Sequence, residues 1–366
     1  GFNIELVKKL RERDAIHGQG MNGLSYHPEE MKVLLEELCS AAGVKVQLHT
    51  RIAAAHREGR QLTTILTESK SGRQAWRAPV FIDTTGDGDL GALAGCEFEI
   101  GEAQACPCQP MSMDALLVVK DAAALAGIIH GTGDMSKGVN TAKMAFLAEI
   151  RRAGVEASYG APTLFPIRDN LLLTMMNHEY GVLATDAAAV SEATLRARGE
   201  LHKIVRGLRK LGGVWEGVQI VATPEQIGIR DGRRIKGRYF VNRDDLIAGA
   251  RHDDAVVRAT FPVDVHALTA EHNKTAPINS AGVKTKPYDI PLRALLARDV
   301  DGLMMAGRCI SGDFIAHASY RVTGNAVAMG EAAGAVAAVA AKTKRAPHDV
   351  QWSEGQAAVT AARSQA

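Results

Sequence analysis

The sequence predicts an α/β fold in which one discontinuous domain is interrupted by a second, α+β domain. The chain has 366 residues, which is more than a single hydrophobic core usually serves. A helix, strands and glycine turns follow one another up to about residue 100, and a strand followed by a long helix returns after residue 296. The segment between them mixes helices with strands and loops, as expected of an inserted domain.

The first long helix is predicted at residues 28–43. Pro28 suits the first helical position and Gly43 suits the end of the helix, while leucines at helical spacing give the segment one apolar face. The six residues that follow, 44–49, read VKVQLH and predict a strand.

Short strands are expected next. Turn signals separate three segments that predict a small antiparallel meander: residues 51–58, 60–69 and 73–80. Residues 80–83, VFID, predict a short buried strand, and the segment LGALAG at residues 90–95 predicts a helix.

The loop between that strand and that helix, DTTGDGD at residues 83–89, concentrates carboxylates and glycines. Asp83, Asp87 and Asp89 are hard oxygen ligands, but an EF-hand frame that starts at Asp83 lacks the glutamate of its twelfth position, so calcium is not expected. Two interpretations stay open. Ligands of open α/β sheets bind at the carboxyl ends of strands, where this loop lies. Alternatively, the loop is a tight turn in which Asp87 or Asp89 caps the helix.

The end of the fold has a similar layout. Residues 303–306 predict a short apolar strand, which leads through a glycine and an arginine into a polar loop and then a long helix of small residues. Gly324, Gly330 and Gly334 destabilise this helix by about 1 kcal/mol each relative to alanine, so we expect close packing against a sheet or a ligand there. A helix that begins after such a loop directs its positive end at an anionic group.

Four arginines gather in residues 228–241: Arg230, Arg233, Arg234 and Arg238. They form either a solvated basic strand edge or an anchor for an acidic substrate, because guanidinium groups pair bidentately with carboxylates. His266, after a short apolar segment, and Tyr288 are isolated polar candidates, and residues of these types are more often structural than catalytic.

The remaining features mainly exclude functions. A net charge of +2 does not favour nucleic acid as a partner, and the small-molecule substrate is the partner we expect. The apolar segment at residues 322–341 contains Glu331 and predicts a buried helix rather than a membrane span. Five cysteines predict no disulfide framework and indicate reduced thiols in a cytoplasmic protein. Cys106 and Cys108 are too close for a metal pair, no metal site is expected, and the sequence specifies no oligomeric state.

A literal G-x-G-x-x-G pattern occurs at Gly18, Gly20 and Gly23. The dinucleotide-binding fingerprint needs a strand directly before it and a helix directly after it, whereas the next predicted helix begins only at Pro28. We therefore interpret this segment as a loop.

Taken together, four segments resemble the FAD-dependent oxidoreductases of the glutathione-reductase-like flavoprotein group: residues 27–46, 71–95, 228–241 with 264–266, and 288–338. The resemblance implies a Rossmann-like FAD-binding domain of the three-layer ββα type, made of residues 1–100 and 296–342. It also implies a substrate domain at residues 101–295 and a C-terminal tail at 343–366. The strand–G-x-G-x-x-G–helix unit with which the family opens is not found, so the first part is expected to lack it.

The resemblance also implies where FAD would lie. Residues from both parts of the outer domain would contact the cofactor: Gly86, Asp87, Gly88, Gly307, Arg308, Ser311, Arg321, Val322, Thr323 and Gly324. A helix N-terminus beside the flavin would stabilise the negative charge that develops at the N1/O2 edge on reduction.

The function implied is that of an FAD-dependent oxidoreductase, with a dehydrogenase reaction as the leading hypothesis and reduction of an activated double bond, protonated by an arginine or a tyrosine, as a related option. A hydride would pass between flavin N5 and a small polar substrate that bears a carboxylate or hydroxyl group. His317, expected in the loop before the last helix, is the first candidate base, and His266 and Tyr288 are alternatives. Arg230, Arg234 and Arg321 would orient a carboxylate. A flavoprotein remnant that acts as a non-catalytic subunit or scaffold is the alternative function.

Overall fold

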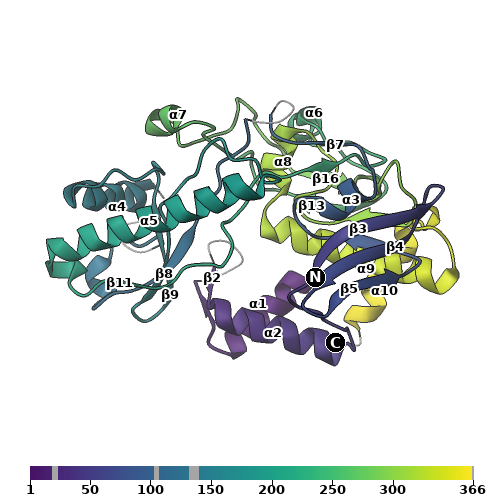
Figure 1. The fold of residues 1–366 in the computed structure, drawn as a ribbon, viewed down its shortest axis with the longest axis horizontal. Helices are drawn as coiled ribbons and strands as arrows, with labels where there is room; N and C mark the ends of the chain where they lie inside the picture. Colours follow the sequence, from purple (N-terminus) through teal and green to yellow (C-terminus); the bar gives the residue numbers. More distant parts are fainter. Residues whose placement is uncertain (19–23, 103–106, 132–139, 365–366) are drawn as a thin grey trace.

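The computed structural model describes residues 1–18, 24–102, 107–131 and 140–364, and it confirms a mixed α/β fold. Two groups of elements lie side by side in Figure 1. One group contains the four-stranded sheet with helices α4 (Asn140–Arg152) and α5 (Ala187–Leu211). The other contains the N-terminal meander and the C-terminal helices. The literal G-x-G-x-x-G pattern falls largely on residues 19–23, outside the described residues.

At the centre of the second group, two strands far apart in sequence pair in parallel. Strand β6 (Phe81–Asp83) lies beside β17 (Leu303–Met305), with Phe81 opposite Leu303 and Asp83 opposite Met305. Both strands are largely buried, as their apolar sequences predict. Because the strands are parallel, the loops that follow them leave the sheet at the same edge.

The elements before β6 largely follow the prediction. Helix α2 spans Pro28–Ala41, and β3 (Arg51–Glu58), β4 (Gln61–Ser69) and β5 (Gly72–Arg77) form an antiparallel sheet in the order β3-β4-β5. The strand predicted at residues 44–49 is wrong, because this segment has no regular structure. A strand needs a hydrogen-bonded neighbour, and none of the described residues pairs with this segment; Val44, Val46 and Leu48 are exposed.

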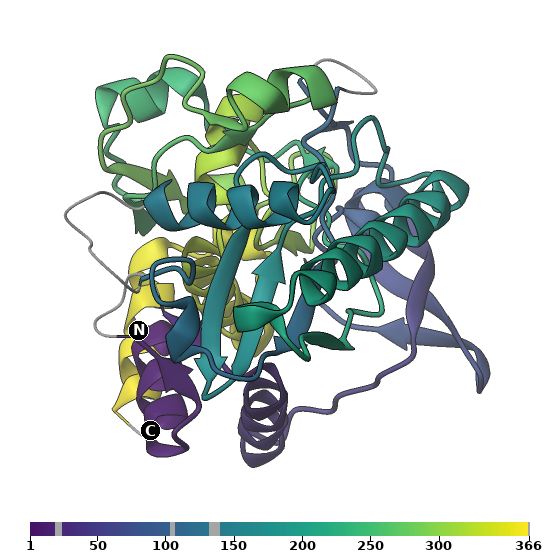
Figure 2. The same ribbon diagram turned by 90° about the vertical axis from the view of Figure 1, so that its left-hand side faces the viewer.

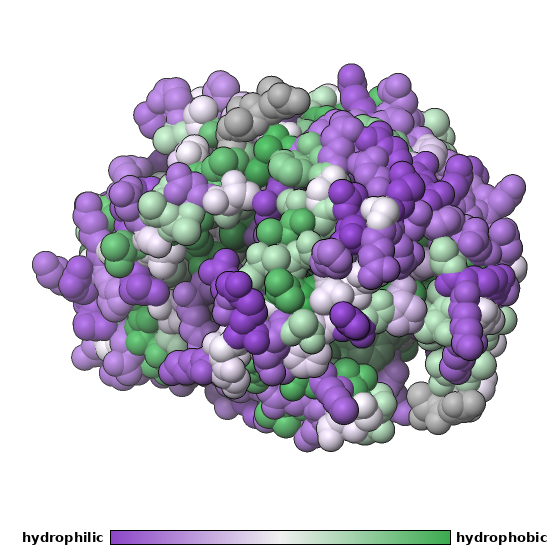
Figure 3. All heavy atoms as spheres, turned by 45° about the vertical axis from the view of Figure 1, so that its right-hand side comes forward, coloured by the Kyte–Doolittle hydropathy of each residue, from purple (hydrophilic) through white to green (hydrophobic). Residues whose placement is uncertain are grey.

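After β17 the chain forms two helices, α8 (Phe314–Tyr320) and α9 (Thr323–Thr343). At Gly330 and Gly334 an added Cβ would meet nothing within 4 Å, so these glycines do not pack closely against a sheet; packing against a ligand stays a prediction. Among the described residues α9 is the one helix with the length and apolar composition to cross a membrane. Only 28% of its apolar 18-residue stretch is buried inside the protein. The face in Figure 3 mixes hydrophilic and hydrophobic side chains.

The C-terminal residues form more structure than the tail that was predicted. A 3-10 helix at Pro347–Asp349 leads into α10 (Trp352–Arg363), which packs along α9. Val350 and Val359 are buried in this contact. The segment is therefore a packed helix at the periphery of the fold (Figure 1).

The central residues form a separate hydrophobic core. Strands β8 (Asp114–Val118), β9 (Thr163–Arg168), β10 (Leu171–Met175) and β11 (Gln219–Ala222) make an antiparallel sheet in the order β11-β8-β10-β9. Figure 2 shows α4 and α5 in front of this sheet, and their apolar faces share one core with it. The side chain of Asp186 caps the first turn of α5.

The remaining elements are short. They are α1 (Phe2–Glu12), β1 (Ile16–His17), β2 (Ser25–Tyr26), α3 (Asp89–Leu93), β7 (Phe98–Glu99), β12 (Arg234–Ile235), α6 (Arg243–Ala248), β13 (Ala255–Ala259), β14 (Val265–His266), α7 (Ala270–Thr275), β15 (Ile278–Asn279) and β16 (Tyr288–Pro291), with 3-10 turns at Ala123–Leu125, Gly213–Trp215 and Leu292–Leu295. Residues 235–350 share a core with residues 62–96. The predicted domain boundaries stay a prediction.

The cysteines correct one expectation. Cys39, Cys96 and Cys309 are free, but Cys108 takes part in a disulfide, so not every thiol is reduced. Cys106 lies outside the described residues.

Candidate active site

The turn after β6 is organised by a buried aspartate. Asp83 accepts hydrogen bonds from the backbone N–H and hydroxyl of Thr85, at 3.0 and 2.7 Å, and from the backbone N–H of Gly91, at 2.9 Å. The predicted capping of α3 by Asp87 or Asp89 is wrong, because the N-cap residue is Gly88. Asp83 is thus a structural residue that fixes the path of the loop.

Within this loop, Asp87 forms an ion pair with Arg308, at 2.9 Å. Burial raises the pKa of Asp87, and the charge of Arg308 opposes that rise. Gly86 has a φ of 80°, and a Cβ there would overlap the guanidinium group of Arg308. The close approach and the left-handed backbone together explain why this position is glycine.

A cavity of about 380 Å³ opens between the carboxyl ends of β6 and β17. Five of the predicted cofactor residues line it: Gly86, Gly307, Arg308, Arg321 and Thr323. Thr323 is the first residue of α9, so the positive end of this helix faces the cavity. Gly330 also lines it, which accounts for the absence of a side chain at that position.

The other predicted cofactor residues do not line this cavity. Gly88 packs against Ile235, where a Cβ would meet the isoleucine side chain at 2.9 Å. Ser311 is buried, and its hydroxyl has no hydrogen-bond partner. Val322 is the N-cap residue of α9, and the carbonyl of Gly324 accepts a hydrogen bond from the side chain of Asn3.

These residues fit an anionic, polar cofactor such as FAD. Within the part of the chain that the structure describes, the buried Nε atoms of Arg308 and Arg321 and the Ser311 hydroxyl lack hydrogen-bond partners, which is the state expected of donors that await a ligand. Glycines at both strand ends leave the backbone accessible, and two guanidinium groups with a helix N-terminus supply positive charge.

Arg321 joins this cavity to a second group of polar residues. Its Nη2 donates to the side-chain oxygen of Gln109, at 3.3 Å, and to the carbonyl and carboxylate oxygens of Asp264, at 2.9 and 3.2 Å. Burial lowers the pKa of Arg321, although the charge of Asp264 counteracts this. One side chain therefore contacts both sites.

His266 lies beside Asp264, with 3.4 Å between its Nε2 and the carboxylate. Burial lowers the pKa of His266 to about 4, against the opposing influence of Asp264. Burial alone would raise the pKa of Asp264, but the hydrogen bond from His266 and the charges of nearby arginines hold it below its usual value. At pH 7 the pair is therefore a neutral imidazole beside a carboxylate.

Two further rings stack near His266. The ring centroids of Tyr159 and His178 are 4.0 Å apart, and that of His178 is 5.0 Å from that of His266. All three side chains are buried, and no described residue forms a hydrogen bond with the Tyr159 hydroxyl, His178 Nε2 or His266 Nδ1. Sequence reasoning missed Tyr159, His178 and Asp264, because no motif spacing connects these segments.

His317 lies in α8 rather than in the predicted loop, because Asp313 caps a helix that begins at Phe314. The ring is fully buried, and neither nitrogen has a hydrogen-bond partner. Burial lowers its pKa, and the charges of Arg234, Arg321 and Arg308 lower it further.

Arg234 and Tyr288 have complete sets of protein partners. Arg234 is buried and donates to the carbonyls of Gly312 and Gly101 and to the carboxylate of Asp231, at 2.9 to 3.1 Å. The Tyr288 hydroxyl donates to the side chain of Ser319, at 2.9 Å. Both side chains hold neighbouring segments together.

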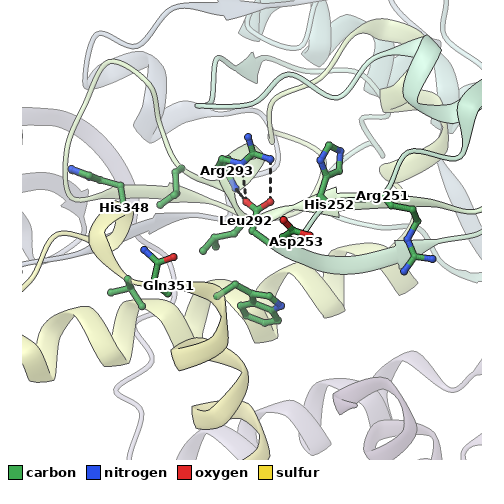
Figure 4. A pocket seen from close by; sticks show the side chains of 11 residues that line it. Arg251, His252, Asp253, Leu292, Arg293, His348 and Gln351 are labelled. Atoms are coloured by element: carbon green, nitrogen blue, oxygen red, sulfur yellow. Dashed lines mark hydrogen bonds and ion pairs between the residues drawn. The ribbon is translucent and has the colours of Figure 1, made fainter.

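Figure 4 shows a second cavity, of about 560 Å³, near the start of α10. Its arginines are already paired: Arg293 with Asp254, and Arg251 with Asp289, at 2.9 to 3.1 Å. This cavity therefore presents no arginine that lacks a carboxylate partner, and it does not adjoin the ends of β6 and β17.

Comparison with known proteins identifies the family. No curated protein matches the sequence. Among solved structures, a geranylgeranyl bacteriochlorophyll reductase-like protein from Thermoplasma acidophilum is 11% identical, with a TM-score of 0.41, over 95% of this chain and 62% of that one. A myxobacterial chondrochloren halogenase, CndH, is 10% identical, with a TM-score of 0.42, over 94% of this chain and 57% of that one. The chain thus spans about three fifths of each structure.

The family model of FAD dependent oxidoreductases matches residues 1–359. The glutathione-reductase-like subtype stays a prediction. The chain belongs to the FAD dependent oxidoreductase family, whose cofactor is FAD.

Proposed function

We propose that this protein is an FAD-dependent dehydrogenase that moves a hydride between a small hydroxyl- or carboxylate-bearing substrate and the flavin. The observation that carries the proposal is the position of Arg321, which lines the cofactor cavity and also bonds to Asp264, the partner of His266. A cofactor in the cavity and a proton acceptor in the polar group would therefore lie close to the same substrate.

When bound, FAD supplies the hydride acceptor at flavin N5. The residues of this chain would hold it: Arg308 and Arg321 by their charge, Gly86 and Gly307 by leaving the backbone open, and α9 by its N-terminus. The rings of Tyr159 and His178 would exclude water from the substrate side, since both are buried.

His266 is the better of the two histidine candidates for the base. It is neutral at pH 7, its Nδ1 is free to accept a proton from a substrate hydroxyl, and the nearby Asp264 stabilises the imidazolium that forms. His317 faces three arginines instead, and their charges oppose its protonation. We therefore give His266 the role of base and keep His317 as the alternative. Arg234 and Tyr288 receive structural roles.

The test begins with the visible absorbance spectrum of the purified protein and acid release of its chromophore. We expect flavin bands and released FAD. Anaerobic addition of small hydroxy acids and of simple alcohols should then bleach the flavin bands for at least one compound. A flavin-loaded protein that none of these compounds reduces would contradict the proposed reaction, while a protein that takes up no FAD would contradict the cofactor site.

A further inference from the structure

Arg230 differs from the other arginines of the site in its partners. Its Nη1 donates to the Pro110 carbonyl and to the Ser112 hydroxyl, both at 2.7 Å, and its Nη2 lies 3.4 Å from the sulfur of Met175. All three acceptors are uncharged. Among the described residues, none forms an ion pair with this partly buried guanidinium.

Every neighbouring arginine, in contrast, has a carboxylate partner. The pairs are Arg233 with Asp89, Arg234 with Asp231, Arg238 with Asp301, Arg308 with Asp87, and Arg321 with Asp264. Partial burial of an unpaired charge is costly, and a carboxylate from outside the chain would offset that cost. The hydrogen bonds from Arg230 to neutral groups fix the orientation of its guanidinium group but do not neutralise its charge.

The groups that face Arg230 restrict the ligand further. Burial and the charge of Arg321 lower the pKa of Arg230 to about 10, so it stays protonated at pH 7. Asp114, at the start of β8, and Arg230 influence each other's charge, and among the described residues Asp114 Oδ1 has no hydrogen-bond partner. The charge of Arg230 also acts on the Tyr159 hydroxyl and the His178 ring, and among the described residues that hydroxyl and His178 Nε2 have no hydrogen-bond partner.

We propose that Arg230 binds the carboxylate of the substrate and that the substrate class is small hydroxy monocarboxylates. This inference rests on the proposed function. With the carboxylate on Arg230, the substrate hydroxyl can face His266, whose ring lies within the same group as Tyr159 and His178. A single unpaired guanidinium suits a monoanion, whereas a dianion such as phosphate would also meet the negative charges of Asp114 and Asp264. Tyr159 and His178 then determine the size of the group between the carboxylate and the hydroxyl.

The test measures binding by calorimetric titration of the FAD-loaded protein with acetate and propionate, and with the corresponding amides. The parent protein should bind the acids and not the amides. Arg230→Met should weaken binding of the acids roughly 10- to 100-fold, the loss expected for a charge-assisted hydrogen bond, and Arg230→Lys should restore part of it. Arg238→Met is the matched control, because it removes one arginine of the same segment that is paired with Asp301, and it should bind like the parent.

FAD content and thermal midpoint, measured for each variant, show whether it is folded. Equal binding of acids and amides by the parent, or equal binding of acids by the parent and a folded Arg230→Met, would overturn the inference. Turnover measurements distinguish a failure of the inference about Arg230 from a failure of the proposed reaction. If hydroxy compounds reduce the flavin whether or not they carry a carboxylate, the reaction stands and the role of Arg230 fails. If acids bind through Arg230 but no hydroxy acid reduces the flavin, the role of Arg230 stands and the reaction fails.

Discussion

Asp87 and Arg308 form an ion pair, at 2.9 Å, although 221 residues separate them in the sequence. The pair joins the loop after β6 to the loop after β17, and both residues come from the glycine-rich turns that end these strands. It therefore holds together the two halves of the cofactor cavity.

Removing the charge of Arg308 should weaken FAD binding. Arg308→Ala leaves Asp87 unpaired in a partly buried place and removes a cation from the cavity, so we expect the dissociation constant for FAD to rise roughly 10-fold or more. Fluorescence titration of the apoprotein with FAD measures this. Arg251→Met, which removes a mostly exposed arginine in the second cavity, is the control, and equal FAD affinities in the two variants would contradict the assignment.

A side chain at Gly86 should disturb the same contact. Gly86→Ala combines a positive φ with overlap against Arg308, so we expect a loss of about 1–3 kcal/mol in the free energy of unfolding together with weaker FAD binding. Gly181→Ala is the matched control, since Gly181 has a φ of 68° and open space around its Cβ position. The Gly181→Ala variant should lose stability through backbone strain alone and should keep its FAD affinity. Urea unfolding measures the stability of both variants.

The pH dependence should identify the base. Activity through His266 requires the neutral ring, so kcat/KM should fall on the acid side only near pH 4, its lowered pKa, and not near the usual 6.5. His266→Ala should lower turnover roughly 100- to 10,000-fold with unchanged FAD content. Asp264→Asn should shift the acid limb to still lower pH, because Asp264 raises the pKa of His266.

His317→Ala is the comparison variant for this series. A larger loss of turnover in His317→Ala than in His266→Ala, at equal FAD content, would transfer the role of base to His317.

Arg234 should matter for stability rather than for substrate. Its guanidinium is buried and pairs with the buried Asp231, so Arg234→Met leaves a buried carboxylate without its cation and should cost about 3–5 kcal/mol in the free energy of unfolding. Arg251→Met removes a mostly exposed arginine from Asp289, which keeps its ion pair with Arg258, and should cost about 0–1 kcal/mol. Denaturant unfolding of both variants compares them directly. Similar losses in the free energy of unfolding would show that burial does not determine how much these ion pairs contribute to stability.

The sequence predicted elements that depend on local periodicity and turn residues. The meander β3-β4-β5, helix α2, and the strands β6 and β17 lie close to their expected positions. The prediction from sequence was wrong at residues 44–49, where alternating apolar residues have no neighbouring strand to pair with. It was also wrong at His317, because Asp313 caps a helix that begins earlier than expected. Local pattern determines what a segment prefers, but pairing needs a neighbour that the pattern does not contain.

What the sequence by itself determined, then, was the α/β class, the two strand ends and the arginine-rich segment. Only the tertiary structure decided which arginine is available to a ligand: Arg234 has its carboxylate in Asp231, while the hydrogen-bond acceptors of Arg230 among the described residues are neutral. The same holds for Tyr159, His178 and His266, which come together from three segments. The reason is physical: burial and ion pairing depend on neighbours in space, and these residues acquire their partners only when distant strands pack together.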